Sequence, residues 1–389
     1  MIKNDLNYIT LDNYSPKSPK LNSLHKNSPK SRKLNSTCLG RVAKRGLFMT
    51  GKKHVAFRDL PVPLEKFELH CNVLTRSGKV CGKPAIKKRG YRKSGSKIQR
   101  YECEAGHRFT VYNLFEHYDP KWVEAFIMHF LETSRIGDAL ESSYKQTNIK
   151  VSINEAKQVL KYIIDLLTNL ELQAMDYATD RRMFEINVSE LEVDEIYQQI
   201  FKKNYDGINA TSKLKKQDHA WVPVILEPIS HYILAADVFK TRSIKDIKTL
   251  FGEAIPLMSD YKGKIVRSDG LKSYKQVVEG LDMTLWSQSK SADYAVINRI
   301  ERLNKEIRKY VRKKRAYTID TLWYLIKLYR FNHNWFLRNA DTGLTPFEYM
   351  KHYKIDSWTQ IIKIAEKLAP LPTRSKNWRK NIRSISEYH

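Results

Sequence analysis

The sequence predicts an α/β fold, a mixed β-sheet with flanking helices, preceded by two smaller modules. The main observation is the order of patterns from residue 185 to residue 314: strand, strand, strand, helix, strand, helix, strand, helix. Strands that alternate with helices in this way pack as a sheet covered by helical layers. Upstream, a basic segment with cysteines and a histidine, followed by helical periodicity, indicates the additional modules.

Net charge indicates the class of partner. The 389 residues include 69 Lys and Arg against 42 Asp and Glu, which gives a net charge of +27. A surplus of this size favours a polyanion, because neutralising phosphates releases counterions. We therefore predict a nucleic acid as the partner, and a basic surface that is merely solvated is the alternative. The sequence contains no apolar run of about 18 residues, the minimum for a membrane span. The N-terminal MIKNDLNYIT lacks a signal-peptide pattern. We expect no membrane association and a cytoplasmic protein on DNA, in the nucleoid if the source is prokaryotic.

The N-terminal residues are predicted to be a disordered basic tail. Ser-Pro-Lys recurs at residues 15–17, 18–20 and 28–30 among few large apolar side chains. Such a composition cannot bury enough surface to offset chain entropy. The tail either follows DNA phosphates or acts as a spacer. The predicted domains are residues 1–50 (disordered basic tail), 51–112 (zinc ribbon), 113–180 (helix-turn-helix region), 181–340 (α/β domain) and 341–389 (C-terminal helix and basic tail).

The zinc ribbon is predicted from cysteine spacing. Cys71 and Cys81 are followed, after a basic segment, by Cys103 and His107. Two pairs of such ligands can hold a structural Zn²⁺ in tetrahedral geometry, and the metal would substitute for a core that a short segment cannot build. His70 is an alternative to Cys71 as the first ligand, and scattered structural cysteines are the alternative to a metal site. Basic and aromatic residues between the ligands suit phosphate contact, and the predicted DNA-binding residues here are Lys88, Arg89 and Arg100.

Two helices are predicted downstream of the zinc ribbon. One begins near Pro120, with apolar residues at helical spacing from Trp122 to Phe130. The other covers about residues 153–168, because Ser152 and Glu155 have the spacing of a capping box. Joined through a turn, the pair would form a helix-turn-helix whose second helix enters a major groove. Ordinary packing of the two helices is the alternative.

The α/β domain is predicted element by element. The second and third strands flank a connection that contains Pro228 and are expected to form a hairpin. Ser243 is expected to cap the following helix, and Asp269-Gly270 is a turn signal at the end of the fourth strand. Strands are expected over residues 189–201, 220–226, 231–239, 264–268 and 282–288, and helices over 244–255, 271–280 and from about 296 to 314.

Three acids from three elements form the candidate catalytic site. Asp194 lies in the first strand, Asp269 at the C-terminal end of the fourth, and Glu301 on the first turns of the last helix. Carboxylates are the ligands that Mg²⁺ prefers, and two ions about 4 Å apart would activate an attacking oxygen and stabilise a leaving one. Strand alternation puts Glu192 on the face of Asp194 and Glu195 on the other face. A solvated acidic edge is the alternative.

The last helix carries a candidate ligand and candidate DNA contacts. Glu306 is the nearest rival of Glu301, but five residues correspond to about 140° around a helix, so both cannot face one pocket. Lys305, Arg308 and Arg312 follow Glu301 on roughly one face and are predicted to bind DNA phosphate. A coiled-coil or solvent-facing role would also explain a helix this basic.

The sequences LEVDEIY, IVRSDGLKSY and NRIERLNKEIRK, in this order and at these distances, resemble the DDE motifs of bacterial and archaeal insertion-sequence transposases. The resemblance covers roughly residues 185–350. It implies a ribonuclease-H-like catalytic core, two Mg²⁺ or Mn²⁺ ions, and hydrolysis plus strand transfer at element ends, with Asp194, Asp269 and Glu301 as the metal-binding triad. The zinc ribbon departs from the family's closely spaced cysteine pairs, because one pair is stretched and the other ends in His107.

The predicted function is that of a DNA transposase that binds element ends. A homo-oligomer is expected, because both ends must be held together. One alternative is a non-catalytic, domesticated DNA-binding regulator. The other is a related metal-dependent nuclease that cleaves without joining.

Overall fold

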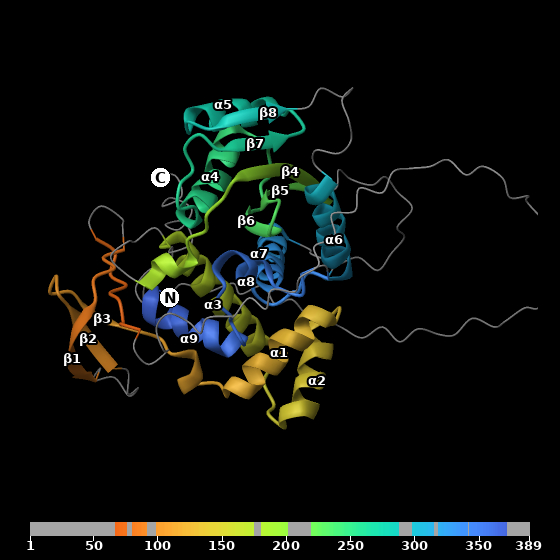
Figure 1. Ribbon diagram of the computed structural model, residues 1–389. Helices are drawn as coiled ribbons and strands as arrows, with labels where there is room; N and C mark the ends of the chain where they lie inside the picture. Colours follow the sequence, from red (N-terminus) through yellow and green to blue (C-terminus); the bar gives the residue numbers. More distant parts are fainter. Residues whose placement is uncertain are drawn as a thin grey trace, which may run out of the picture. The chain divides into compact units, whose positions relative to one another are not determined.

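The predicted strands of the α/β domain form a single five-stranded sheet in the computed structural model (Figure 1). The strands are β4 (Glu190–Gln199), β5 (His219–Glu227), β6 (Tyr232–Ala236), β7 (Ile265–Ser268) and β8 (Thr284–Ser287). The structure describes residues 67–75, 80–91, 99–174, 180–200, 219–287, 298–314, 318–340 and 342–371. Both predicted tails, residues 1–50 and the basic C-terminal stretch from 372, lie outside these ranges.

The sheet is mixed, and its order is β6-β5-β4-β7-β8. β5 runs antiparallel to both of its neighbours, whereas β4, β7 and β8 are parallel. The predicted β5–β6 hairpin is confirmed, and the Glu227 carboxylate accepts hydrogen bonds from the turn nitrogens of Ile229 (3.1 Å) and Ser230 (2.6 Å). The long central strand β4 thus pairs with the hairpin on one side and with β7 on the other.

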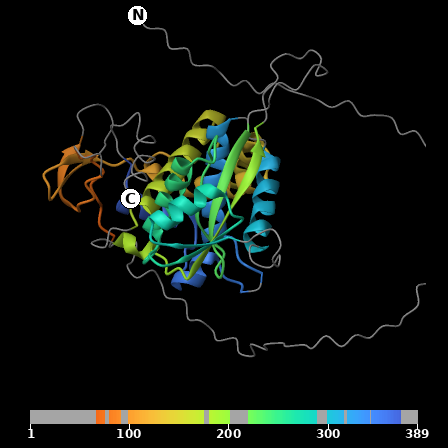
Figure 2. The same cartoon turned by 90° about the horizontal axis from the view of Figure 1, so that it is seen from above.

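Helices cover both faces of the sheet. They are α4 (Ile244–Ala254), α5 (Lys272–Gly280), α6 (Asn298–Lys314) and α7 (Ile319–Trp335). On one face, Ile196 of β4 packs with Ile300 of α6 and Leu325 of α7. On the other face, Val193 packs in a cluster that includes Leu250 of α4. Figure 2 shows the strands between α6 on one side and α4 on the other. Alternate residues of β4 therefore face two separate apolar layers, as strand geometry requires, and the predicted α/β fold with flanking helices is confirmed.

Three helices, not two, precede the sheet. They are α1 (Pro120–Glu132), α2 (Ile136–Thr147) and α3 (Ile153–Leu172). The predicted capping box of α3 is present, with Ser152 and Glu155 bonded reciprocally. The prediction that the first and third helices are joined through a turn is wrong, because α2 lies between them. The sequence of α2 is mostly polar, and it has too few large apolar side chains to have marked it as a helix.

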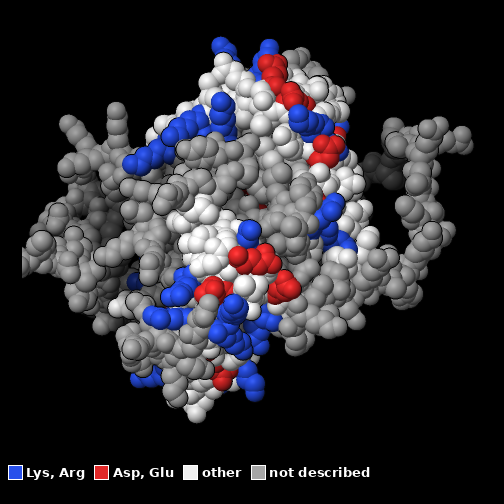
Figure 3. All heavy atoms as spheres, turned by 90° about the vertical axis from the view of Figure 1, so that its left-hand side faces the viewer, with Lys and Arg blue, Asp and Glu red and all other residues white. Residues whose placement is uncertain are grey.

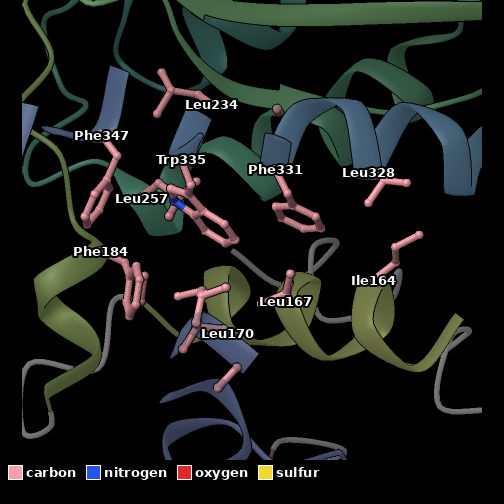
Figure 4. Close-up of a cluster of buried hydrophobic side chains, with 14 of the residues drawn as sticks. Ile164, Leu167, Leu170, Phe184, Leu234, Leu257, Leu328, Phe331, Trp335 and Phe347 are labelled. Carbon is pink, nitrogen blue, oxygen red and sulfur yellow. The ribbon is translucent and has the colours of Figure 1, made fainter. Parts of the chain in front are cut away.

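The C-terminal half of α3 is a core element. Every residue from Ile163 to Leu172 is buried. In Figure 4, Ile164, Leu167 and Leu170 of α3 face the row of apolar side chains that α7 presents. Only the N-terminal half of α3 has an exposed face, where Gln158 and Lys161 lie. Any contact of α3 with DNA is therefore restricted to its first turns.

A network of charged side chains is buried between α3, α4 and α7. Arg330 of α7 donates to Glu171 of α3, and Lys327 donates to Glu253 of α4 at 2.5 Å. All four side chains are less than a tenth exposed. Burying such charges is tolerated only because they are paired, and removing one partner would strand the other in a poorly solvated site.

A small antiparallel sheet stands before the helices, with the order β1-β2-β3. It is joined to the C-terminal part of the chain, because the His70 nitrogen donates to the Lys367 carbonyl (2.9 Å) and the Asn72 amide to the Leu371 carbonyl (2.7 Å). The remaining elements are β1 (Ala85–Tyr91), β2 (Gln99–Cys103), β3 (Arg108–Thr110), α8 (Pro346–Lys351), α9 (Trp358–Leu368) and the 3-10 turns η2 (Leu114–Glu116), η3 (Asp180–Phe184) and η4 (Ile255–Leu257). Across the ranges that the structure describes, no helix has both the length and the apolar character needed to cross a bilayer.

Glu366 of α9 is a buried carboxylate that makes stability depend on pH. It accepts hydrogen bonds from the Leu114 nitrogen (2.7 Å) and the Tyr162 hydroxyl (3.0 Å). Burial nevertheless raises its pKa to about 7. The folded chain therefore holds a proton that the unfolded chain releases between pH 4.5 and 7, so the contribution of this group to stability is lost as pH rises through that window.

We expect Glu366→Gln to become more stable relative to wild type as pH rises from 5 to 8, by on the order of 2–3 kcal/mol. Urea unfolding of both proteins at the two pH values measures the difference. Glu279→Gln, which alters an exposed carboxylate on α5, is the control and should show no such trend. Equal pH dependence of wild type and Glu366→Gln would contradict the assignment.

Candidate active site and metal centres

Three carboxylates meet at one edge of the large sheet. One oxygen from each of Asp194, Glu195 and Asp269 lies within 4.8 Å of the others. The sheet register explains the meeting: Val193 pairs with Ser268 across the parallel strands β4 and β7, so the next residues, Asp194 and Asp269, leave that pair side by side. Asp269 follows the C-terminal end of β7, the position where α/β folds commonly bind ligands. Asp194 lies in the middle of β4, directly after the stretch that pairs with β7.

The turn after β7 exposes the Asp269 carboxylate. Gly270 has φ +90°, a left-handed backbone region that favours glycine. Its nitrogen donates to the Ser268 hydroxyl (3.2 Å), while the Leu271 nitrogen donates to the Asp269 carboxylate (3.3 Å). The predicted turn is therefore present, and it bends the backbone away while Asp269 remains exposed to solvent.

Helix α6 is fastened to β4 next to these acids. The Glu192 carboxylate accepts a hydrogen bond from the Ile300 nitrogen (3.0 Å), and Asp194 accepts one from the Asn304 side-chain amide (2.7 Å). Glu192 and Asp194 thus share the α6 face of the strand, as alternation predicted. Burial, and then the neighbouring carboxylates of Asp269 and Glu301, raises the pKa of Asp194, and the Asn304 bond partly offsets this effect.

Glu301 lies in the first turn of α6 on the side of Asp194. It is exposed, and its charge contributes to the raised pKa of Asp194. Its rival Glu306 is directed elsewhere, because it accepts from the Tyr329 hydroxyl of α7 (3.4 Å) and lies 3.8 Å from Arg302. The charge of Glu301 therefore acts on Asp194, whereas Glu306 contacts Tyr329 and Arg302. The oxygens that share the 4.8 Å cluster come from Asp194, Glu195 and Asp269, without Glu301.

Glu195 is the acid that the sequence reasoning did not include. Its side chain leaves β4 on the opposite face from Asp194, toward α5, yet its carboxylate still reaches the cluster because Asp269 sits at the end of the adjoining strand. It is 9% exposed, and one carboxylate oxygen has no hydrogen-bond partner among the described residues. Burial, then Asp269 and Asp194, raise its pKa to about 7, whereas the Tyr274 hydroxyl and, less strongly, Arg242 lower it. The sequence feature that could have identified Glu195 is its position directly after the candidate ligand Asp194.

The basic residues of α6 divide into two groups. Lys305 and Arg312 are exposed and Arg308 is half-buried, so all three predicted DNA contacts reach the surface. By contrast, Lys313 and Lys314 donate to the last carbonyls of α1, where cations complement the helix dipole. The C-terminal end of α6 therefore has a packing role, and its middle carries the cations that are free to meet a phosphate.

The four predicted zinc ligands lie together. The ligand atoms of Cys71, Cys81, Cys103 and His107 are within 4.8 Å of one another, with Cys71 Sγ 3.9 Å from His107 Nδ1 and Cys81 Sγ 4.0 Å from Cys103 Sγ. Ligands about 2.0–2.3 Å from a tetrahedral ion lie about 3.3–3.8 Å apart, so the set would close around an ion by a contraction of at most about 1–1.5 Å in any pair. Burial raises the pKa of the Cys71 thiol. The donor set fits Zn²⁺.

The alternative first ligand, His70, has another partner. Its Nδ1 lies 2.7 Å from the Gly82 carbonyl oxygen, and the side chain is buried.

Of the predicted DNA contacts on this module, Lys88 and Arg100 are exposed, whereas the Arg89 side chain lies outside the described residues. Lys88 also lines a cavity of about 650 Å³ between the small sheet and α9. In Figure 3 both basic and acidic side chains appear among the described residues on this side.

The carboxylate cluster can hold divalent cations. Asp194, Glu195 and Asp269 offer oxygen ligands from a rigid strand pair, and hard cations such as Mg²⁺ and Mn²⁺ prefer oxygen. Burial and the neighbouring like charges raise the pKa of Asp194 and of Glu195, and a bound cation would offset this repulsion. The unpartnered Glu195 oxygen has room for one more bond. The residues present therefore fit a divalent metal centre.

Comparison with known proteins shows distant likenesses only. No protein-family model and no curated protein matches the chain. A chain of the simian T-cell lymphotropic virus intasome in complex with PP2A regulatory subunit B56 gamma is 12% identical, with TM-score 0.33, and the match covers 49% of this chain and 60% of that one. The catalytic core domain of BIV integrase is 14% identical (TM-score 0.28), over 42% of this chain and 94% of that one. The pre-cleavage Mos1 transpososome is 10% identical (TM-score 0.21), over 55% and 75%.

Proposed function

We propose that the chain is a DNA transposase of the DDE type, with a ribonuclease-H-like core that cuts and rejoins DNA. The observation that supports the proposal is the meeting of Asp194, in the middle of β4, with Asp269, which directly follows the parallel strand β7. The charge of Glu301 on α6 also acts on Asp194. The three residues would hold two Mg²⁺ or Mn²⁺ ions. When bound, the ions would activate the attacking oxygen and stabilise the leaving one.

The chain's own residues supply position and charge in the proposed mechanism. Asp269 and Asp194 approach the scissile phosphate from the sheet edge, and Asn304 holds the Asp194 carboxylate in place. Water attacks the phosphodiester, and the bond from phosphorus to the 3′ oxygen breaks, which releases a 3′-hydroxyl and leaves a 5′-phosphate. The 3′-hydroxyl then attacks a phosphodiester of target DNA in line. A new ester bond forms, and the target strand's own bond from phosphorus to its 3′ oxygen breaks. Lys305, Arg308 and Arg312 continue from Glu301 along α6 and hold the DNA backbone by charge.

The N-terminal modules would recognise the element ends. In the proposal Cys71, Cys81, Cys103 and His107 form a structural zinc ribbon that presents Lys88, Arg89 and Arg100 to phosphate. The helix-turn-helix would be formed by α2 and the exposed first turns of α3, because the rest of α3 is buried. Simultaneous binding of two ends would require a homo-oligomer on double-stranded DNA.

The two alternative functions differ from the proposal in what they leave out. A domesticated regulator would bind DNA without a working metal centre, whereas a related nuclease would cleave without joining. The fit of the acid cluster to divalent cations favours an enzyme. Joining of a DNA 3′-hydroxyl to a target duplex separates a transposase from a nuclease.

We expect Glu301→Gln to reduce Mg²⁺-dependent cleavage and joining by about 10²-fold or more, because one ligand charge at the metal centre is lost. Glu306→Gln on the same helix is the matched control and should stay within about threefold, since it alters an exposed contact with Arg302 and a long hydrogen bond from Tyr329, both away from the acid cluster. The assay incubates plasmid with a labelled 3′-hydroxyl oligonucleotide and scores nicks and joined label. Full activity of Glu301→Gln combined with loss in Glu195→Gln would reassign the third ligand to Glu195. Cleavage by the wild type without joined label would establish the nuclease instead.

A further inference from the structure

An aromatic surface lies beside the carboxylate cluster and has no role in the proposed chemistry. Tyr197 of β4 stacks with His219 of β5 (ring centroids 5.3 Å apart, interplanar angle 29°) and meets Trp221 edge-on at 5.1 Å. The Arg242 guanidinium, just before α4, lies 4.0 Å from the centre of the Trp221 ring. We call these four side chains the aromatic ladder.

The ladder is open to solvent. Tyr197 is 47% exposed, His219 and Arg242 are exposed, and Trp221 is half-buried. Cross-strand aromatic pairs stabilise antiparallel strands by about 0.2–1 kcal/mol, and Tyr197 and Trp221 are directly paired. That role explains two rings, but it does not require a third ring and a guanidinium stacked on the same side.

The ladder and the acids occupy the same edge of the sheet. Tyr197 follows Glu195 by two residues on the same face of β4, a separation of about 7 Å at the usual strand rise. On the other side, the Arg242 carbonyl accepts a hydrogen bond from the Ser273 hydroxyl (3.1 Å), in the first turn of the helix that follows Asp269. A DNA strand whose phosphate lies at the acids would therefore pass the ladder within one or two nucleotides.

Exposed π-faces next to a cation suit one ligand class. Bases stack on aromatic side chains only where they are unpaired, because in a duplex both faces of a base are already covered. Arginine adds charge that meets the phosphate between two stacked bases. A protein partner would be a poorer match to a chain with a net charge of +27.

We propose that the aromatic ladder binds an unpaired base of the DNA strand adjacent to the phosphate held at the acid cluster, with Arg242 on the neighbouring phosphate. The proposal rests on the proposed function for the phosphate's location. It implies that the chain selects DNA whose end is frayed or single-stranded, and that it discriminates against a fully paired end.

The test measures binding, not chemistry, in an Asp269→Asn background that keeps the DNA intact. Fluorescence anisotropy compares a labelled oligothymidine, a duplex of equal length, and the oligothymidine with one abasic nucleotide. We expect Tyr197→Ala to weaken oligothymidine binding about tenfold and duplex binding less than twofold. Tyr197→Trp should restore the affinity, and replacing one thymidine with the abasic nucleotide should reduce wild-type affinity without further reducing that of Tyr197→Ala.

Tyr349→Ala is the matched control, because Tyr349 is 37% exposed on α8 and lies on no strand of the sheet. It should bind all three probes like the parent. Equal weakening of oligothymidine and duplex, unchanged binding of both, or a loss of self-association by light scattering without loss of oligothymidine binding would each overturn the proposal. Circular dichroism and thermal midpoints establish that the variants fold. If Asp269→Asn alone leaves DNA cleavage intact while the Tyr197 effect persists, the proposed function fails and the ladder stands as a single-strand binding surface.

Discussion

Asp269→Asn is expected to abolish both DNA cleavage and joining, with a loss of about 10³-fold or more, because an amide cannot supply the anionic ligand that a divalent metal needs. The variant should fold normally. Asp269 is exposed and accepts a hydrogen bond from the Leu271 nitrogen, which an asparagine oxygen can also accept. The measurement is the rate of plasmid nicking and 3′-hydroxyl joining with Mg²⁺ and with Mn²⁺.

Asp260→Asn supplies a matched control for this variant. Asp260 is also exposed and also accepts from the nitrogen two residues on, that of Lys262 (3.1 Å), but it lies outside the acid cluster. Its activity should equal that of wild type. A second readout is thermal: Mn²⁺ should raise the midpoint of wild type and of Asp260→Asn but not of Asp269→Asn, since only a bound ion stabilises the folded state by mass action. Intact cleavage and joining in Asp269→Asn would end the assignment of the catalytic centre.

Cys103→Ser is expected to release zinc and unfold the small sheet. Cys103 is fully buried, ends β2, and packs with Cys71 and Phe109 in a cluster too small to hold the sheet without a metal. Wild type should contain about one zinc per chain and the variant almost none, as elemental analysis of the purified proteins would show. Proteolysis should then cut the variant between residues 67 and 112, where wild type resists.

Cys38→Ser is the control for the zinc experiment, because it removes a thiol that is not among the four predicted ligands. It should retain the full zinc content. His70→Gln answers the remaining question about the first ligand: zinc should stay bound, since His70 contacts the Gly82 carbonyl and does not lie in the ligand cluster. Unchanged zinc in Cys103→Ser, or zinc lost from His70→Gln, would refute the ligand set.

Local patterns predicted most of the elements of the α/β domain. The alternation of β4, the Ser243 cap and the Pro228 connection each produced the expected strand, helix or hairpin, because capping and alternation depend on residues that are close in the chain. The buried stripe of α6 was also apparent, and Ile300, Leu303 and Ile307 are buried. Helix α2 was not predicted, because its mostly polar sequence contains few apolar residues that would mark a buried face.

The sequence by itself determined which residue types are available: two strand-associated aspartates, a glutamate on a basic helix, and three cysteines followed by a histidine. It also determined the turn at Gly270, because only a glycine adopts that backbone conformation at little cost. Only the tertiary structure decided how these groups meet. The parallel register of β4 and β7 sets Asp269 beside Asp194 and brings in Glu195 from the other face of the strand, and the docking of α6 adds Asn304. Such contacts join residues far apart in the chain, and strand register and helix docking depend on the packing of the whole core, which no short pattern encodes.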